Sequence, residues 1–195
     1  MNILKRQLII VFLGLLLLPW HASAFVSELW PEEGRPVFRS KVEVLLLHER
    51  PSVKSKIKKQ QIKKRSLITF DETRYRNVRS GAIKVLRDIS IQGRDFGTLK
   101  YLTSKHYYSD IPDRVFVVKH GDIIEYLQER AEGSCLVRCK GRVIELESCP
   151  FGETTEEYQI ISKPVNEWWV RVVMNKKPIG WLLIDDKVVD EDREF

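Results

Sequence analysis

Hydrophobic and polar residues follow one another in short runs along most of the chain, and no long stretch has the period of an amphipathic helix. The clearest pattern lies in residues 167–186, where two runs rich in tryptophan and β-branched residues flank a short polar turn. Such a pattern predicts an antiparallel hairpin. Because this stretch contains Trp168, Trp169 and Trp181, much of the aromatic bulk of the chain belongs to one hairpin.

Further strands are predicted at similar spacing, with turn residues between them. The candidate strands lie at residues 41–48, 66–70, 81–91, 114–118, 123–128, 135–139 and 142–146, and residues 158–162 lead into the tryptophan hairpin. The segments predicted as loops or turns are residues 71–73, 76–77, 93–97 and 119–122. Residues 98–108 fit either a short strand or a helical turn. Many short strands separated by turn signals predict an all-β fold, either a sandwich or small barrels.

The same pattern suggests how the chain is divided. Residues 25–40 contain prolines and glycine without a clear period, and we expect an irregular opening segment there. A first β domain is predicted over residues 41–112 and a second over 113–190, with the breaker Ile-Pro-Asp at 111–113 between them. Residues 191–195 are predicted to form an acidic tail.

The first 24 residues have the composition of a secretory signal peptide. Lys5 and Arg6 supply a positive start, residues 8–18 form an apolar run, and Ala22-Ser23-Ala24 is a small-residue cleavage site. A membrane anchor is the alternative, but eleven apolar residues are too few to span about 30 Å of hydrocarbon. We therefore expect cleavage after Ala24, a periplasmic or secreted protein, and no membrane association of the mature chain.

In an oxidising compartment the three cysteines can form disulfides, and their odd number leaves one unpaired or joined to another chain. Residues 135–139 and 142–146 read as a hairpin with Lys140-Gly141 as its turn. Cys135 and Cys139 are then about 13 Å apart on one strand, which is too far for a bridge. Cys149 follows the returning strand near the level of Cys135. We predict a Cys135–Cys149 disulfide and an unpaired Cys139.

The net charge is +6, or +4 without Lys5 and Arg6, which is too small to indicate nucleic-acid binding. The basic residues are dense in one place, however: residues 52–65 include Lys58, Lys59, Lys63 and Lys64. This strip has two interpretations. It can attract an anionic partner, or it can be a solvated loop and sheet edge whose lysines prevent aggregation, which is the commoner case.

We find no catalytic motif, no metal-binding spacing and no cofactor fingerprint in the sequence, and we expect none of the three. Strand alternation places Trp168 and Trp169 on opposite faces, so one of them can face a ligand while the other packs in the core. The alternative is that all the tryptophans are core residues. The candidate ligand-binding residues are Trp169, Arg171, Trp181, Tyr107 and Tyr108.

Three segments resemble bacterial SH3-like domains. They are Leu46 to Val53, which runs into a Pro-Ser pair; residues 119–124, Lys-His-Gly-Asp-Ile-Ile; and the closing pattern of Trp169, Val172, Gly180 and Trp181. The resemblance implies one complete C-terminal SH3-like barrel and a partial or divergent N-terminal one. It also implies a non-catalytic exported binding module that recognises a cell-wall peptide of peptidoglycan or a periplasmic protein. The alternatives are a small secreted enzyme with Cys139 as nucleophile, and an inhibitor or structural subunit.

Overall fold

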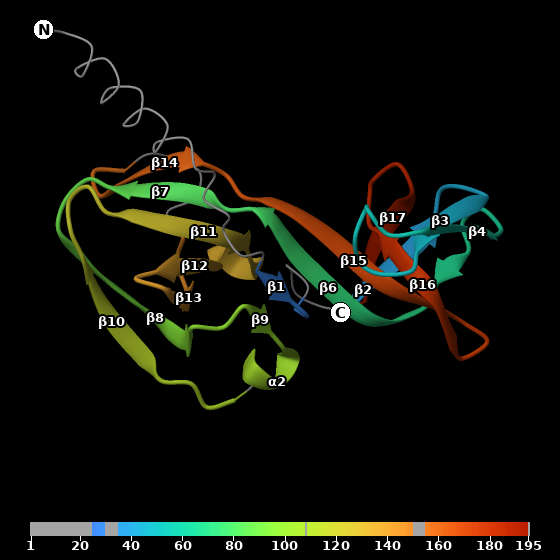
Figure 1. The fold of residues 1–195 in the computed structure, drawn as a ribbon, viewed down its shortest axis with the longest axis horizontal. Coiled ribbons are helices and arrows are strands. Elements are labelled where there is room, and N and C mark those ends of the chain that lie inside the picture. Colours follow the sequence, from blue (N-terminus) through green and yellow to red (C-terminus); the bar gives the residue numbers. More distant parts are fainter. Residues whose placement is uncertain (1–24, 30–34, 108, 150–154, 195) are drawn as a thin grey trace, which may run out of the picture.

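The structure is a computed structural model that describes residues 25–29, 35–107, 109–149 and 155–194 (Figure 1). The regular secondary structure of the described chain is almost entirely β-strand, with one short helix, α2 (Ser104–Tyr107), and one 3₁₀ turn at Ala131–Gly133. The all-β prediction is confirmed. None of the three sheets closes into a barrel over these residues. The predicted signal peptide lies outside the described residues, and within them no helix has the length and apolar content that a membrane crossing requires.

Two of the sheets have seven strands and the third has three. The first sheet has the order β4 (Ile57–Gln61), β3 (Val44–His48), β16 (Lys177–Leu183), β15 (Val165–Met174), β6 (Phe70–Arg79), β1 (Val26–Ser27) and β9 (Tyr101–Leu102). The second has the order β10 (Asp113–Val118), β8 (Ile89–Gly97), β13 (Arg142–Leu146), β12 (Cys135–Cys139), β11 (Ile123–Glu129), β7 (Gly81–Val85) and β14 (Tyr158–Ser162). The third consists of β17 (Val189–Glu194), β2 (Arg35–Ser40) and β5 (Leu67–Ile68).

Two long paired strands, β6 and β15, run along the long axis and join the two ends of the molecule (Figure 1). Every strand of the second sheet comes from residues 81–162, which form one end of the molecule. We call this end the middle lobe because it comes from the middle of the sequence. The opposite end is built from β2 to β5, β16 and β17, together with the near halves of β6 and β15, and we call it the end lobe. The predicted boundary at 112–113 falls between β8 and β10, which pair with each other over all six residues of β10. The middle lobe is thus inserted between the two chain segments of the end lobe.

Three of the four segments predicted as loops or turns are wrong. Residues 71–73 and 76–77 belong to the ten-residue strand β6, because β15 and β1 supply hydrogen-bonding partners on its two sides. Residues 93–97 lie within β8. Gly93 is needed there for close packing rather than for a turn, since a Cβ atom would lie 2.2 Å from the carbonyl oxygen of Glu145.

Both ends of the described chain are more regular than the sequence predicts. Residues 35–40 of the predicted irregular segment form β2, and most of the predicted acidic tail belongs to β17. These two strands pair along their whole length in antiparallel register, from Arg35 opposite Glu194 to Ser40 opposite Val189. Each segment has few apolar residues of its own, and a distant partner therefore decides its conformation.

Both predicted hairpins are confirmed. β12 and β13 pair across the turn at Lys140-Gly141, whose φ values of 49° and 78° are those of the turn that favours glycine at its second position. β15 and β16 pair across Asn175-Lys176, with φ values of 52° and 62°. The predicted disulfide is also present: Cys135 and Cys149 are bonded, with their Cα atoms 5.8 Å apart, and the Cys139 thiol is unpaired and buried.

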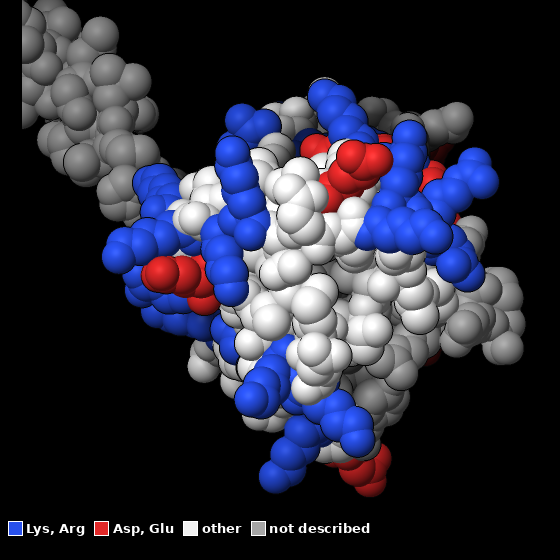
Figure 2. All heavy atoms as spheres, turned by 90° about the vertical axis from the view of Figure 1, so that its right-hand side faces the viewer, with Lys and Arg blue, Asp and Glu red and all other residues white. Residues whose placement is uncertain are grey.

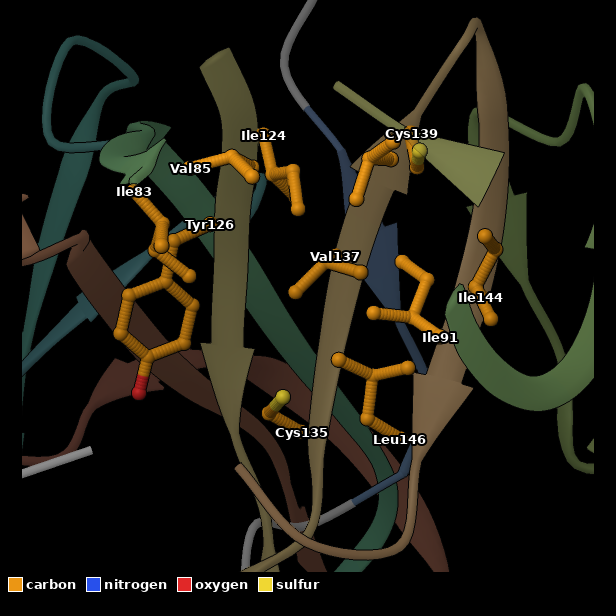
Figure 3. Close-up of a cluster of buried hydrophobic side chains, with 11 residues drawn as sticks. Ile83, Val85, Ile91, Ile124, Tyr126, Cys135, Val137, Cys139, Ile144 and Leu146 are labelled. Atoms are coloured by element: carbon orange, nitrogen blue, oxygen red, sulfur yellow. The ribbon is translucent and has the colours of Figure 1, made fainter. Parts of the chain in front are cut away.

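The hydrophobic core has three parts. One lies on a face of the second sheet and includes Ile83, Tyr126, Val137 and Ile144 together with Cys135 (Figure 3). A second fills the end lobe, and a third lies between the other face of the second sheet, β9 and the opening residues of the described chain. The part in the end lobe consists of Phe38, Leu45, Leu47, Ile68, Phe70, Val170, Val172, Leu182 and Val189. The third part consists of Phe25, Leu29, Phe96, Leu102, Leu127, Leu136 and Val143. Each lobe therefore has its own apolar interior.

Candidate functional site

An apolar hollow of about 300 Å³ opens in the end lobe, between β4 at the edge of the first sheet, β5 at the edge of the third, and the tip of the β15–β16 hairpin. Most of its lining is aliphatic, including Leu45, Ile62, Leu67, Val173 and Met174. The polar lining consists of Gln60, Ser66, Thr69 and Asn175. The two sheets thus leave a cavity at their open side whose walls favour an apolar group and offer a few hydrogen-bonding atoms.

The pairing of β3 with β4 decides which side chains face this hollow. Gln60 lies opposite the buried Leu45, and Lys58 opposite the buried Leu47, so both are on the hollow side of the sheet. Lys59 lies opposite Leu46, which is 48% exposed, and is therefore on the outer face.

Lys63 and Lys64 lie in the turn that leads from β4 to β5. The two ends of this turn, Ile62 and Ser66, both line the hollow. The turn is fixed by backbone hydrogen bonds from Ser66 to Lys63 (3.0 Å) and from Arg65 to Ser40 (2.7 Å). The lysine strip predicted from the sequence therefore follows the rim of the hollow.

The strip carries positive charge that this chain does not neutralise. Lys58, Lys59, Lys63 and Lys64 are exposed, and within the described part of the chain none of their ammonium groups has an ion pair or hydrogen bond. Figure 2 looks onto this end of the molecule, where Lys and Arg side chains outnumber acidic ones and surround an uncharged area. Anionic groups are therefore attracted to this end.

The candidate residues Trp169, Arg171 and Trp181 lie close together on the face of the first sheet that is opposite to the hollow. Trp169 is completely buried, its Nε1 donates to Glu167 (3.0 Å), and its ring packs edge-on against His48. Trp181 is 7% exposed, and the guanidinium of Arg171 lies 6.0 Å from its ring centre. These tryptophans are core residues of the sheet.

Arg171 already has two carboxylate partners within the chain. Its Nε lies 2.8 Å from Asp71, and its Nη1 lies 2.8 Å from Glu72 on the neighbouring strand β6. The hydrogen bond from Arg171 lowers the pKa of Asp71 below its ordinary value. A ligand carboxylate would have to displace these partners, which makes Arg171 a poor binding group.

Tyr107 belongs to another cluster. It lies in α2, stacks on Phe96 and donates a hydrogen bond to Glu145 (3.2 Å), and the guanidinium of Arg94 lies 4.6 Å from its ring centre. Tyr108 lies outside the described residues. The structure therefore brings together three of the five candidate ligand residues, in a packed face, and places Tyr107 in the middle lobe.

The groups considered for chemistry are poorly suited to it. Cys139 is buried, and burial raises the pKa of its thiol, so the reactive thiolate is disfavoured. Within the described residues no group of three or more His, Cys, Asp or Glu side chains is arranged to hold a metal ion.

Sequence reasoning found the lysine strip but missed the hollow beside it. The lining comes from two stretches that are far apart in the chain, residues 45–69 and residues 172–179. The available signal was the position of Ile62 and Leu67, two aliphatic residues on either side of the basic turn.

No protein-family model, curated protein sequence or solved structure matches this chain. The fold and the site define an all-β protein with a basic, partly apolar end surface. The function has to be inferred from that surface.

Proposed function

We propose that this protein is a non-catalytic exported binding module that recognises an anionic cell-wall or protein partner through the lysine-rich rim of its end lobe. The observation that carries the proposal is the unneutralised charge of Lys58, Lys59, Lys63 and Lys64 beside an apolar hollow. Several other basic side chains on the protein surface have acidic partners, as Arg171 and Lys119 do. A strip that served only as a solvated edge would not need an apolar cavity behind it.

The nature of the partner follows from the same features. A mildly basic rim attracts carboxylates, and an aliphatic cavity accepts a small apolar side chain. The resemblance of residues 113–190 to SH3-like domains suggests the peptide stems of peptidoglycan, which carry carboxylates. Because the described sheets do not close into a barrel, the proposal depends on the surface and not on that resemblance.

The cysteine-dependent enzyme is the weaker candidate. Its nucleophile would be Cys139, whose thiol is buried beside Val137 and Ile144 in the core of the middle lobe. A raised thiol pKa and the absence of an exposed approach both oppose nucleophilic attack.

The test compares two variants that lose the same charge. The strip variant replaces Lys58, Lys59, Lys63 and Lys64 by Gln. The control variant replaces Lys84, Lys100, Lys105 and Lys187 by Gln; these lysines also lack an ion pair among the described residues. Each protein is sedimented with purified peptidoglycan, and separately eluted from an anionic matrix by a salt gradient.

Four exposed lysine contacts at about 0.3–0.5 kcal/mol each add up to roughly tenfold in affinity. The strip variant is expected to lose about that much binding and to elute at lower salt, while the control elutes close to the original protein. Equal elution of the two variants would show that only the net charge matters, and the proposed site would be abandoned.

A further inference from the structure

The rim of the hollow includes a sheet edge with open hydrogen-bonding groups. β4 is the terminal strand of the first sheet and pairs only with β3. The Ile62 amide donates a hydrogen bond to the carbonyl oxygen of Glu43, the residue just before β3 (3.0 Å). Along an antiparallel pair, residues whose backbone groups point toward the partner strand alternate with residues whose backbone groups point away from it. The backbone groups of Ile57, Lys59 and Gln61 therefore point away from β3, toward the free edge.

Most of these groups have no partner among the described residues. One exception is the Gln61 carbonyl oxygen, which accepts a hydrogen bond from the side chain of Gln60 (3.0 Å). Both N–H donors and C=O acceptors are thus available along the outer side of β4. A free edge of this kind can accept a further strand.

The charge of β4 decides what kind of strand fits. A second copy of this chain, pairing edge to edge, would bring Lys58 and Lys59 against the same lysines, and like charges oppose that contact. An acidic segment has the opposite effect, because its carboxylates lie beside these ammonium groups.

We propose that the free edge of β4 binds an extended acidic segment of a partner protein as an added strand, with an apolar side chain of that segment in the hollow. This inference rests on the proposed function and specifies the partner for the same surface. Apolar and acidic side chains alternate along the bound segment. A side chain opposite Gln60 lies over the hollow and is apolar, whereas a side chain opposite Lys59 shares the outer face and is acidic.

An amphiphile with an anionic head group is a poorer occupant. Its head group accepts hydrogen bonds but donates none, so it leaves the outward carbonyl groups of Ile57 and Lys59 without partners. A peptide backbone supplies both kinds of group at the strand spacing.

The probe is a short synthetic peptide that alternates valine and glutamate, measured by isothermal titration against the full chain with its disulfide intact. Two further peptides carry N-methyl groups, one on the glutamates and one on the valines. If the added strand is antiparallel, the glutamate amides opposite Lys59 face β4 and the valine amides face away. Methylation of the glutamate amides should then weaken binding by about tenfold or more, and methylation of the valine amides should leave it nearly unchanged.

If methylation of the valine amides alone weakens binding, strand addition is also supported, and the added strand is then parallel to β4. Equal effects of the two methylated peptides would overturn it, since binding would not depend on which amides face the edge.

The hollow is tested separately. Thr69 is exposed and lines the cavity, so Thr69→Trp fills it without entering the core. This variant should lose affinity for the valine peptide and keep its weaker affinity for a peptide with glycine in place of valine. If it binds both as the original protein does, the hollow is not part of the site.

The proposed function and the strand addition would fail in different ways. If the strip variant binds every anionic probe as well as the control variant does, the proposed function is wrong. If the strip variant loses binding but the methylated peptides and Thr69→Trp have no selective effect, only strand addition is wrong. If the protein binds phosphatidylglycerol vesicles more strongly than it binds the peptide, and if this binding depends on the strip lysines, then the partner is a lipid surface and strand addition is wrong.

Discussion

The Cys135–Cys149 disulfide should contribute a large share of the stability of the middle lobe. It closes a loop with a sequence separation of 14, and the chain-entropy relation gives about 3 kcal/mol for a loop of this size. Because the chain in its reduced form keeps all its side chains, adding a reductant removes this contribution without changing the composition of the core.

We expect reduction to lower the free energy of unfolding by about 3 kcal/mol. With a urea dependence of about 2 kcal/mol per molar, the unfolding midpoint should fall by roughly 1.5 M. Urea titrations followed by tryptophan fluorescence, with and without reductant, measure this shift.

The control is Cys139→Ala, which leaves the disulfide in place. It should cost only about 1 kcal/mol, as a small truncation in a core does, and should remain sensitive to reductant. Alkylation of the unreduced, denatured protein should label Cys139 alone. An unchanged midpoint on reduction, or labelling of Cys135 or Cys149 in place of Cys139, would refute the argument.

Three further predictions concern single residues. Trp169→Ala removes a completely buried side chain and should destabilise the protein by about 3–5 kcal/mol in the same urea titration; a loss below 1 kcal/mol would mean that the ring is not in the core. Gly93→Ala places a methyl group 2.2 Å from the Glu145 carbonyl oxygen and should cost about 1–3 kcal/mol, whereas unchanged stability would contradict the close packing of β8 against β13. Burial, and a hydrogen bond from its hydroxyl to Glu28, raise the pKa of Tyr101 to about 12. The fold therefore favours the protonated phenol, and its contribution is complete below about pH 10 and lost as the pH rises toward 12. Thermal unfolding between these pH values should be less pH-dependent for Tyr101→Phe, and an identical pH dependence would contradict the raised pKa.

The sequence predicts well those elements whose hydrogen-bonding partner is next to them in the chain. Lys140-Gly141 is the clearest case, since two residues of the right type separate two apolar runs and determine both the turn and the register. The Cys135–Cys149 pairing could be derived because it depends only on that register.

Elements whose partners are distant were predicted less well. The strand β6 is rich in charged residues and looks like a loop, but Glu72 lies opposite Arg171, almost a hundred positions later, and the two form an ion pair. A sequence does not show that opposite charges meet across a sheet, so neither the strand nor the internal partners of Arg171 could be predicted.

The candidate site divides in the same way. The lysine strip is a local feature and was found directly. Its apolar neighbour is formed by strands of different sheets, and only the three-dimensional arrangement reveals it. The tryptophans were noticed because they are large and clustered, which in this protein reflects packing between strands.

The pairing of β2 with β17 has a consequence for the way this polypeptide acquires its native state. Residues 81–162 supply every strand of the second sheet, which can therefore form before residues 189–194 are present, while β2 has to wait for those residues. Until those residues arrive, one side of β2 is uncovered and open to wrong pairings. A shortened chain that stops before Val189 should accordingly be prone to aggregate even though its middle lobe is intact.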